Sequence, residues 1–399
     1  MHQVKSPTRR KILFVLHEAT LTGAPIIALE LMQWLHRNHA VDLLIITPTG
    51  GSIENELKPL GEYIAISQEL YFSGERFIKD QFKFITNLAR KHRIKIIKEK
   101  IRDWKPELVY FNSLVAWEQQ SYFDEIDCPV ITHIHEMSFV IGSEERQKLL
   151  NIAISRSCKL ILCSESVRTS LASRADISSS IAPVVHSFLP ERIQKNITNN
   201  PDKFDISSII DIPKDAFVVG CVGTVCWRKG SDLFIQVAKI IGKQLHGRPI
   251  IYLWIGHGHQ EELRRIRHDI ALSEMADSVF FIGGKTDVSH FYQCFDLFLL
   301  TSREDPFPLV MLEAAYCSIP LIGFSGSGGI EEFGADGAAV LVPYLDINAM
   351  AEEALTLLSE PDRRVAMGQS AREYVINNFN SEISCNLIYD VIEETLTYK

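Results

Sequence analysis

The sequence lacks the features of several protein classes. Its eight cysteines include no C-x-x-C pair and lie mostly inside apolar runs, which indicates free thiols rather than disulfides or a zinc site. No segment reaches the roughly 18 uncharged apolar residues of a membrane span. The early apolar run, 12–16, is too short for a signal peptide. We therefore expect a soluble, cytoplasmic protein.

Familiar catalytic motifs are also missing. There is no G-x-S-x-G, no H-E-x-x-H, no P-loop and no D-x-D clamp for a metal–nucleotide complex. The G-x-G at Gly256–Gly258 lacks the third glycine of the dinucleotide fingerprint, because residue 261 is glutamate. These absences argue against a hydrolase and against an NAD-dependent oxidoreductase.

The charge is acidic overall but unevenly distributed. The 399 residues carry a formal net charge of −9, which disfavours nucleic acid as the main partner. Residues 76–105 nevertheless contain eleven Lys/Arg and three acids, a net charge of +8, on a segment with helical apolar spacing. This segment predicts contact with an anionic membrane surface or an anionic acceptor; a solvated charged face is the simpler alternative.

Short apolar runs alternate with segments of helical period along the whole chain. In the first half, helices are expected at 24–37 and 144–155, with helical material between Pro48 and Glu107. The expected strands of that half are 11–17, 41–48, 107–112, 130–135, 159–163 and 184–188. Those of the second half are 217–222, 250–255, 279–282, 297–301, 320–324 and 340–342, and the chain is helical from Ile347 onward. Continuous Val/Ile/Leu runs indicate strands covered on both faces, hence α/β domains with parallel sheets.

A polar segment divides the two halves. Residues 191–213 are rich in Asn, Asp and Pro, which is typical of a domain boundary. We therefore expect a first Rossmann-like domain at 1–190, a linker at 191–212 and a second Rossmann-like domain at 213–380. The last helix, 381–399, is expected to pack back on the first domain.

Ligands of open parallel sheets bind beyond the carboxyl ends of the strands, and two such places stand out in the first half. Gly23 precedes a helix that follows the first strand, although a tight turn without a ligand explains it equally well. His133 and His135 share one face at the end of another strand. Zinc binding there lacks a third ligand, and a hydrogen-bonded structural histidine is the alternative for each.

The second half offers a pair of cations before a helix. Arg228 and Lys229 precede a helix that begins near Ser231. Two positive charges oppose the dipole at a helix start, and a bound anion would offset that penalty. A solvated surface pair explains them equally well.

An isolated carboxylate lies in the next helix. Glu313 is the only charged residue between Pro306 and Gly329, so it needs hydrogen-bond partners from a ligand or from neighbouring groups. Glu304 and Asp305 lie at the mouth of the same helix, and a glycine-rich loop follows it. A capped helix with a structural buried glutamate is the alternative.

These residues resemble the donor-binding domain of retaining glycosyltransferases of the GT-B fold, family 4 type. The family's E-x7-E pattern is similar to Asp305…Glu313, with Asp305 where the first glutamate is usual and Glu304 one residue too early. Lys229 falls on the family's phosphate-binding lysine, and Arg228 adds a second charge beside it. Either Asp305 or Glu304 would serve as the first carboxylate.

Other positions carry a looser resemblance to the same family. Thr224 replaces the arginine of the family's G-R-L-x-x-x-K-G, and Gly328-Gly329 is similar to its GGxPE loop. In the first half, Gly23 resembles the glycine loop that faces the donor diphosphate. His135 matches the family's active-site histidine, and the alignment with the family favours His135 over His133 for this role.

The resemblance implies two Rossmann-like, doubly wound parallel-sheet domains facing a cleft. A nucleotide-diphospho-sugar donor, UDP- or GDP-linked, would be held mainly by the second domain, with Glu313 on the ribose and Lys229 and Arg228 on the diphosphate. The sugar would contact Asp305 and the backbone of Phe307, Pro308 and Leu309. The first domain would bind the acceptor.

The implied activity is that of a hexosyltransferase acting with retention, without a metal or cofactor. The acceptor, whether a glycan, a lipid-linked sugar or a small molecule, is unidentified, and nucleic acid is not expected. The protein would be cytoplasmic and peripheral at the inner membrane face. A non-catalytic sugar-nucleotide-binding protein and a same-fold sugar-nucleotide epimerase are the alternatives.

Overall fold

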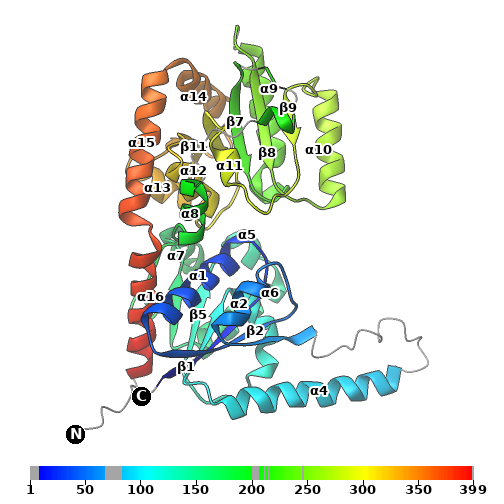
Figure 1. The fold of residues 1–399 in the computed structure, drawn as a ribbon, viewed down its shortest axis with the longest axis vertical. Coiled ribbons are helices and arrows are strands. Elements are labelled where there is room, and N and C mark those ends of the chain that lie inside the picture. The colour runs from blue at the N-terminus through cyan, green and yellow to red at the C-terminus, as the bar shows by residue number, and fades with distance from the viewer. Residues whose placement is uncertain are drawn as a thin grey trace. The chain divides into compact units, whose positions relative to one another are not determined.

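Two parallel sheets organise the chain (Figure 1). The computed structural model describes residues 9–67, 83–199, 206–210, 212–213, 215–244 and 247–397. The chain divides into a first unit, Met1–Cys163, Val167–Val185 and Ser381–Lys399, and a second unit, Ser164–Ser166 and His186–Asn380. The C-terminal helix thus belongs to the first unit, although it lies at the far end of the sequence.

The first sheet has six parallel strands in the order β3-β2-β1-β4-β5-β6. The strands are β1 (Arg10–Leu16), β2 (Val41–Thr47), β3 (Glu62–Ala65), β4 (Leu108–Asn112), β5 (Val130–Ile134) and β6 (Lys159–Leu162). After β1 the chain builds the sheet outward in one direction through β2 and β3, then returns to add β4 to β6 on the other side. The sheet therefore reverses its strand order between β1 and β4, where such folds form a ligand-binding crevice.

Helices cover both faces of the first sheet. They are α1 (Gly23–Asn38), α2 (Glu54–Leu57), η1 (Lys58–Leu60), α4 (Lys83–Trp104), η4 (Leu114–Tyr122), α5 (Ser138–Ile141), α6 (Glu144–Arg156), α7 (Glu165–Ala172) and α16 (Ser381–Thr397). Side chains of successive strand residues alternate between the faces. Asn112 accordingly reaches α1, while the neighbouring Phe111 stacks on Trp117 of η4. Helix α16 packs on α1, where Trp34 donates a hydrogen bond to Glu382 at 2.7 Å.

The second sheet repeats the same order, β12-β11-β10-β7-β8-β9, with all pairs parallel. Its strands are β7 (Phe217–Val222), β8 (Ile250–Ile255), β9 (Val279–Phe281), β10 (Leu297–Leu300), β11 (Leu321–Phe324) and β12 (Val340–Val342). The helices are α8 (Glu191–Asn199), η5 (Ile206–Ser208), η6 (Trp227–Lys229), α9 (Ser231–Gln244), α10 (Gln260–Leu272), α11 (Ser289–Tyr292), α12 (Leu309–Tyr316), α13 (Gly329–Ala335), α14 (Ile347–Ser359) and α15 (Pro361–Asn378). Here the strand order reverses between β7 and β10.

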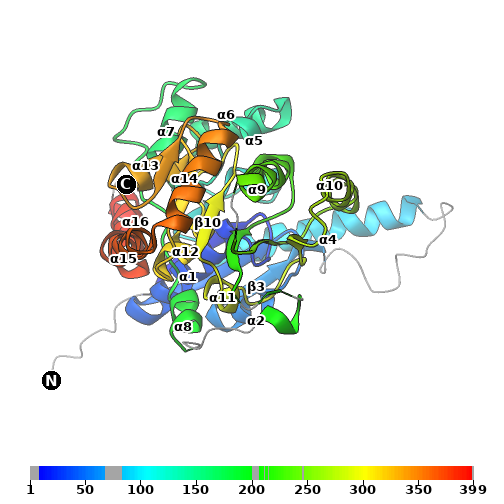
Figure 2. The same cartoon turned by 90° about the horizontal axis from the view of Figure 1, so that it is seen from above.

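The core of the second unit fixes which helices lie on which face. Phe234 of α9, Trp254 of β8 and Met350 of α14 belong to one buried cluster. On the opposite face, Tyr292 of α11 lies beside Phe298 of β10. Helices α9 and α11 therefore cover opposite sides of the sheet (Figure 2). Between these two layers, the loops that follow β7 and β10 begin where the strand order reverses.

The predicted fold class is confirmed, since both halves form six-stranded parallel sheets with flanking helices. Two sequence-based expectations were wrong in detail. No strand forms at 184–188, where Val184 makes a single bridge to Leu162. The segment after Pro48, expected to be helical, includes strand β3, which is only four residues long. Among its described residues, the segment 191–212 that was predicted to be a linker contains helices α8 and η5.

Candidate functional site

The cations Arg228 and Lys229 and the carboxylate of Asp305 meet where the second sheet reverses its order. Lys229 ends η6, after β7, and its ammonium donates a hydrogen bond to Asp305, which follows β10. Arg228 Nη1 lies 3.7 Å from Asp305 Oδ1 and donates to the backbone oxygen of Glu304 at 2.6 Å. The structure thus brings together two sequence segments that are 76 residues apart.

Close backbone contacts hold these two segments in place. Thr301 Oγ1 donates to the carbonyl oxygens of Lys229 at 3.1 Å and Gly230 at 3.0 Å. Gly230 has a φ of +70°, and a Cβ there would lie 1.9 Å from the carbonyl oxygen of Thr301. Only glycine fits this position, because it tolerates left-handed φ and has no side chain to clash. The glycine therefore sets the distance between Lys229 and the end of β10.

Asp305 is ionised within this cluster. Its side chain is buried, and burial alone would raise the pKa, but Lys229 and Arg228 lower the pKa below its ordinary value. Two cations against one carboxylate leave the cluster with a net positive charge. A cluster of this kind at the carboxyl ends of parallel strands is suited to binding an anionic group. The Asp305 side chain contacts both cations, and the Glu304 backbone oxygen accepts a hydrogen bond from Arg228.

The glycine loop lies directly beside Asp305. The Asp305 amide donates to the Ser327 carbonyl at 2.7 Å, and the Gly329 amide donates to the Asp305 carbonyl at 3.0 Å. A Cβ on Gly329 would lie 2.5 Å from the ring of Phe307. Gly328 has a φ of +122°, a conformation that favours glycine. Both glycines therefore allow this loop to lie close to the segment that contains Asp305.

The start of α12 follows the same segment. Phe307 is buried, Pro308 is the N-cap residue and Leu309 begins the helix. Proline fits a helix start because its missing N–H would have no helical partner there.

Glu313 lies one turn into α12 and faces α11. Tyr292 donates a hydrogen bond to Glu313 Oε2 at 2.7 Å, and both side chains are buried. Burial raises the pKa of Glu313 to about 7, although the Tyr292 hydrogen bond and the charge of Arg192 act in the opposite direction. The sequence indicated that Glu313 needs a partner; Tyr292, 21 residues earlier, carried no recognisable signal.

Arg303 is a residue of this region that sequence reasoning missed. Its guanidinium makes paired hydrogen bonds to Asp232 at 2.8 and 2.7 Å and lies over the Trp227 ring, 4.8 Å from the centroid. The hydrogen bond to Asp232 raises the pKa of Arg303. This pairing connects the end of β10 to the start of α9. In the sequence Arg303 is a charged residue next to Glu304, but no local pattern indicates that Asp232 is its partner.

The first unit places Gly23 and His135 around Asn112. Gly23 begins α1, and the next carbonyl, that of Ala24, accepts a hydrogen bond from Asn112 at 2.9 Å. His135 follows β5, and its Nε2 lies 3.2 Å from Asn112 Oδ1. His133, which shares the face of His135, instead pairs its Nδ1 with the hydroxyl of Tyr110 at 2.8 Å. Burial lowers the pKa of His133 to about 3, so this ring is a neutral, structural residue.

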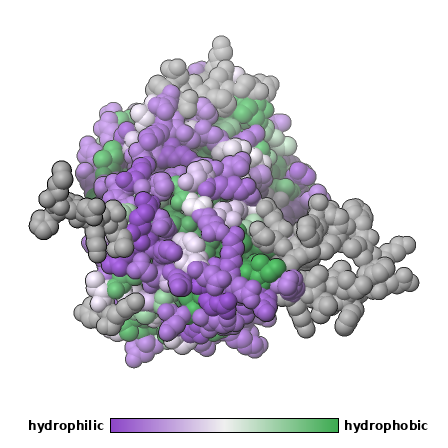
Figure 3. Space-filling model, turned by 60° about the horizontal axis from the view of Figure 1, so that its bottom comes forward, coloured by the Kyte–Doolittle hydropathy of each residue, from purple (hydrophilic) through white to green (hydrophobic). Residues whose placement is uncertain are grey.

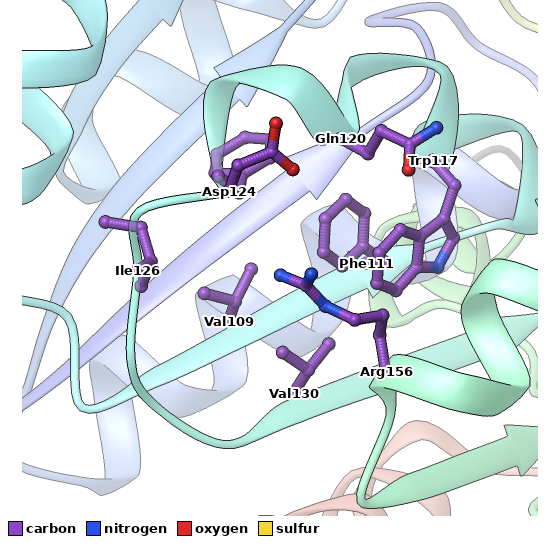
Figure 4. Close-up of a pocket in the computed structure, with 9 residues that line it drawn as sticks. Val109, Phe111, Trp117, Gln120, Asp124, Ile126, Val130 and Arg156 are labelled. Carbon is purple, nitrogen blue, oxygen red and sulfur yellow. The ribbon is translucent and has the colours of Figure 1, made fainter.

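A small cavity lies on the other face of the first sheet (Figure 4). Phe111, Trp117 and Arg156 line it, and its volume is about 20 Å³. A cavity of this size holds about one water molecule. It is too small for a sugar or a nucleotide and lies away from Asn112.

The described part of the chain shows neither a cluster of metal-binding side chains nor a membrane-spanning helix. Within it, no three His, Cys, Asp or Glu side chains are grouped so that they would hold a metal ion. In the same residues, no helix combines the length and apolarity needed to cross a bilayer.

Comparison with known proteins shows what the part of the chain that holds this site is similar to. Residues 202–374 match the model of glycosyl transferases group 1. The chain is 35% identical over 123 residues to N-acetyl-alpha-D-glucosaminyl L-malate synthase of Bacillus anthracis, covering 30% of this chain and 32% of that protein. It is 26% identical over 166 residues to a GDP-mannose-dependent alpha-(1-6)-phosphatidylinositol monomannoside mannosyltransferase of Mycobacterium tuberculosis, covering 39% and 42%. The matches therefore span less than half the length of these relatives.

The fold is also similar to that of a solved structure. HepE from Anabaena, crystallised in complex with UDP and glucose, matches with a TM-score of 0.77 at 16% identity, over 96% of this chain and 100% of that one. The chain thus has the GT-B fold of two Rossmann-like domains. Most of its second unit carries the sequence pattern of the group 1 glycosyl transferases, and that part includes Lys229, Asp305 and Glu313.

Proposed function

We propose that the protein is a retaining, metal-independent glycosyltransferase that moves a hexose from a UDP- or GDP-sugar to an acceptor. The observation that carries this proposal is the cluster of Arg228, Lys229 and Asp305 at the strand-order reversal of the second sheet. This cluster lies inside the segment that matches the glycosyl transferase family. The names of similar proteins include both a GDP-mannose-dependent enzyme and a complex with UDP and glucose, which supports a nucleotide-sugar donor.

In this proposal the cations bind the donor diphosphate. Glycosyl transfer passes through an oxocarbenium-like state while negative charge grows on the leaving phosphate. Preorganised cations and amides stabilise such charge without a metal, and this stabilisation is usually the largest catalytic contribution. Lys229 and Arg228 would supply the positive charge that faces the phosphates.

The donor's other parts would be held by carboxylates and backbone. Asp305 would contact the sugar hydroxyls together with the first turn of α12, and Glu304 is the alternative carboxylate. Glu313 would accept hydrogen bonds from the ribose hydroxyls, since one of its oxygens is already oriented by Tyr292. His135, in the first unit, stays a predicted active-site residue.

Donor binding tests the central role of Lys229. Isothermal titration with a panel of UDP- and GDP-sugars is expected to give saturable binding in the presence of EDTA. Lys229→Ala should weaken that binding at least about tenfold, equivalent to about 1.4 kcal/mol, because a charge-assisted contact to phosphate is lost. Lys243→Ala, a change of an exposed lysine on α9, should bind like the unchanged protein. Binding of no donor in the panel would refute the proposal, and an unaffected Lys229→Ala would remove Lys229 from this role.

Product analysis separates transfer from the two alternatives. One observation favours a non-catalytic binding protein: the aspartate that replaces the usual glutamate already pairs with Lys229. Incubation with donor and candidate acceptors, followed by mass spectrometry and NMR of the anomeric proton, should reveal an acceptor product of retained configuration. Conversion of the donor alone would identify an epimerase. Tight donor binding without turnover on any acceptor would identify a sugar-nucleotide-binding protein.

We also propose that the basic segment 76–105 lets the protein reach a lipid-linked acceptor at an anionic membrane face. Residues 76–82 lie outside the described residues. In the described part of α4, Lys100 pairs with Glu62 at 2.8 Å and Lys95 with Glu99 at 3.6 Å, so some of the positive charge is compensated locally. On the face drawn in Figure 3, hydrophobic residues form small, separate patches among hydrophilic ones.

Co-sedimentation with liposomes tests this contact. Vesicles with anionic lipid should pellet the protein, and neutral vesicles should not, because the attraction is electrostatic. Replacing the basic residues of 76–93 by glutamine should abolish pelleting. Negligible pelleting with both kinds of vesicle would show that this segment is a solvated face.

A further inference from the structure

Two exposed aromatic side chains, Trp227 and Tyr344, lie at the carboxyl edge of the second sheet. Trp227 follows β7 and is 51% exposed, and Tyr344 follows β12 and is 50% exposed. Both contact Arg303, which follows β10: its guanidinium lies over the Trp227 ring, and its carbonyl accepts a hydrogen bond from the Tyr344 hydroxyl at 3.1 Å. We call Trp227 and Tyr344 the aromatic platform. All three residues belong to the second unit.

The Trp227 ring is held in a fixed position. Arg303 Nη1 donates to the Trp227 carbonyl at 2.7 Å, and the Arg303 amide donates to the Arg228 carbonyl at 2.8 Å. A cation within about 6 Å of a tryptophan ring is attracted to its face. The guanidinium therefore covers one face of the ring, and the exposed remainder is accessible to a ligand. A ring that is already fixed loses little conformational entropy when a ligand binds to it.

Tyr344 is fixed by its own surroundings. Its ring meets the buried Phe324 edge-to-face, with centroids 6.4 Å apart. The next residue, Leu345, has a φ of 62° although it is not glycine, a conformation that persists only where surrounding contacts enforce it. The Asp346 carboxylate accepts the Ala349 amide at 2.9 Å and so fixes the start of α14 directly after this turn. Tyr344 thus keeps a defined orientation at the surface.

The aromatic platform offers ring surface but no net charge. Arg303 pairs with Asp232 through two parallel hydrogen bonds, so these two charges compensate each other. An anionic ligand would instead be attracted to Arg228 and Lys229. Rigid aromatic rings among polar groups suit a ligand that has both apolar and hydrogen-bonding surfaces. A neutral sugar has this combination, because the C–H faces of its ring are apolar and its edge carries hydroxyls.

The aromatic platform and the proposed ribose site lie on opposite sides of the sheet. Glu313 bonds to Tyr292 of α11, whereas Arg303 bonds to Asp232 of α9. These two helices cover opposite faces of the second sheet. A nucleotide whose ribose contacts Glu313 therefore directs its base toward α11, away from the platform. This placement favours a sugar over the nucleobase of the donor as the ligand of the platform.

We propose that the aromatic platform binds a neutral sugar residue of the acceptor, so that the acceptor is a glycan. This inference rests on the proposed function, which places the donor diphosphate at Arg228 and Lys229. Trp227 directly precedes Arg228 in the chain, so a sugar stacked on its ring lies beside the leaving diphosphate. The second unit therefore contributes to acceptor recognition as well as to donor binding.

A glycan array tests this binding without a donor and without an activity assay. The labelled protein, applied to a panel of neutral and anionic glycans, should bind neutral ones. Trp227→Ala should weaken binding of the best neutral glycan at least about tenfold, as expected for the loss of a central aromatic contact. Trp227→Tyr keeps an aromatic ring and should retain most of the affinity. Leu272→Ala, which removes an exposed apolar side chain of α10 in the same unit, should bind like the unchanged protein.

A second variant and a kinetic measurement keep the test valid if Trp227→Ala does not fold. Tyr344→Ala removes the other ring of the platform and should also weaken glycan binding. In transfer assays with that glycan as acceptor, both variants should raise the KM for the acceptor at least about tenfold. Their kcat at saturating acceptor should change much less, because the lost contact is made equally in the ground state and the transition state.

Distinct results would overturn this inference and the proposed function. Absence of binding to any neutral glycan, or binding that neither Trp227→Ala nor Tyr344→Ala weakens, would overturn the role of the platform. So would a Trp227→Ala variant that binds glycans normally but loses UDP, since the ring would then stack on the nucleobase. A protein that binds glycans through the platform but binds no sugar nucleotide would instead refute the proposed function.

Discussion

Replacing Glu313 by glutamine should stabilise the second unit above neutral pH. Burial raises the pKa of Glu313 from its ordinary 4.5 to about 7, so the folded chain binds a proton there more tightly than the unfolded chain. Between these two pH values the folded state holds more protons, and its stability therefore falls as the pH rises. This difference in pKa lowers the free energy of unfolding by about 3 kcal/mol once the pH exceeds the pKa of Glu313 in the folded state. Glutamine keeps an acceptor for Tyr292 and does not titrate.

Scanning calorimetry at pH 5, 6, 7 and 8 would measure this effect. For a unit of this size, about 1 kcal/mol shifts the Tm by roughly 2–4 °C, so Glu313→Gln should melt roughly 6–12 °C higher than the unchanged protein at pH 8. At pH 5 the difference should be small. Glu352→Gln, an exposed change on α14 of the same unit, should show no pH-dependent difference.

The result that would refute this reasoning is a Glu313→Gln difference that stays constant from pH 5 to pH 8. A constant offset would mean that Glu313 is ionised in the folded state throughout, and that burial does not dominate its proton affinity. At pH 8 the same variant should bind a nucleotide sugar more weakly, because an amide is a poorer acceptor for two ribose hydroxyls than a carboxylate. Gain in stability with loss of binding would show that this carboxylate is retained for its ligand.

Two further changes probe the contacts around Lys229. In calorimetry, Gly230→Ala should destabilise the second unit by about 3 kcal/mol or more, because its Cβ would lie 1.9 Å from the Thr301 carbonyl oxygen. Gly337 also has a positive φ, of +79°, but no atom lies within 4 Å of an added Cβ. Gly337→Ala should therefore cost only about 1 kcal/mol. Equal costs for the two would contradict the steric argument. Asp305→Asn should bind UDP about tenfold more tightly, since Lys229 loses its competing carboxylate, and should transfer sugar poorly. Weaker UDP binding by this variant in calorimetric titration would contradict that competition.

The sheets were largely predictable from the sequence, because buried parallel strands are continuous apolar runs. β7 and β8 were predicted with the bounds that the structure shows. β3 was missed because only Ile64 and Ala65 of its four residues are buried apolar side chains, which is too little for a recognisable run. The apolar segment at 184–188 was mistaken for a strand because hydrophobicity reports burial, and burial does not require a sheet partner.

The candidate site was predictable only residue by residue. Arg228, Lys229 and Asp305 could be named from local patterns and from the resemblance, but their mutual contact depends on the pairing of β7 with β10. Tyr292 and Asn112 could not be found, because nothing in their local sequence sets them apart from ordinary core residues. Their roles follow from which strand or helix lies beside them, and this information is spread over the whole chain.

The position of α16 has a consequence for how the chain folds during synthesis. The ring of Tyr389 stacks on His39 at 3.6 Å, and Cys385 is buried within the same unit, so the last helix completes the packing around α1. The second unit is almost continuous, from His186 to Asn380. It can therefore finish folding as soon as it leaves the ribosome, while the first unit must wait for the final residues. The first unit is thus begun first and completed last, and the side of α1 that packs on α16 stays uncovered in between.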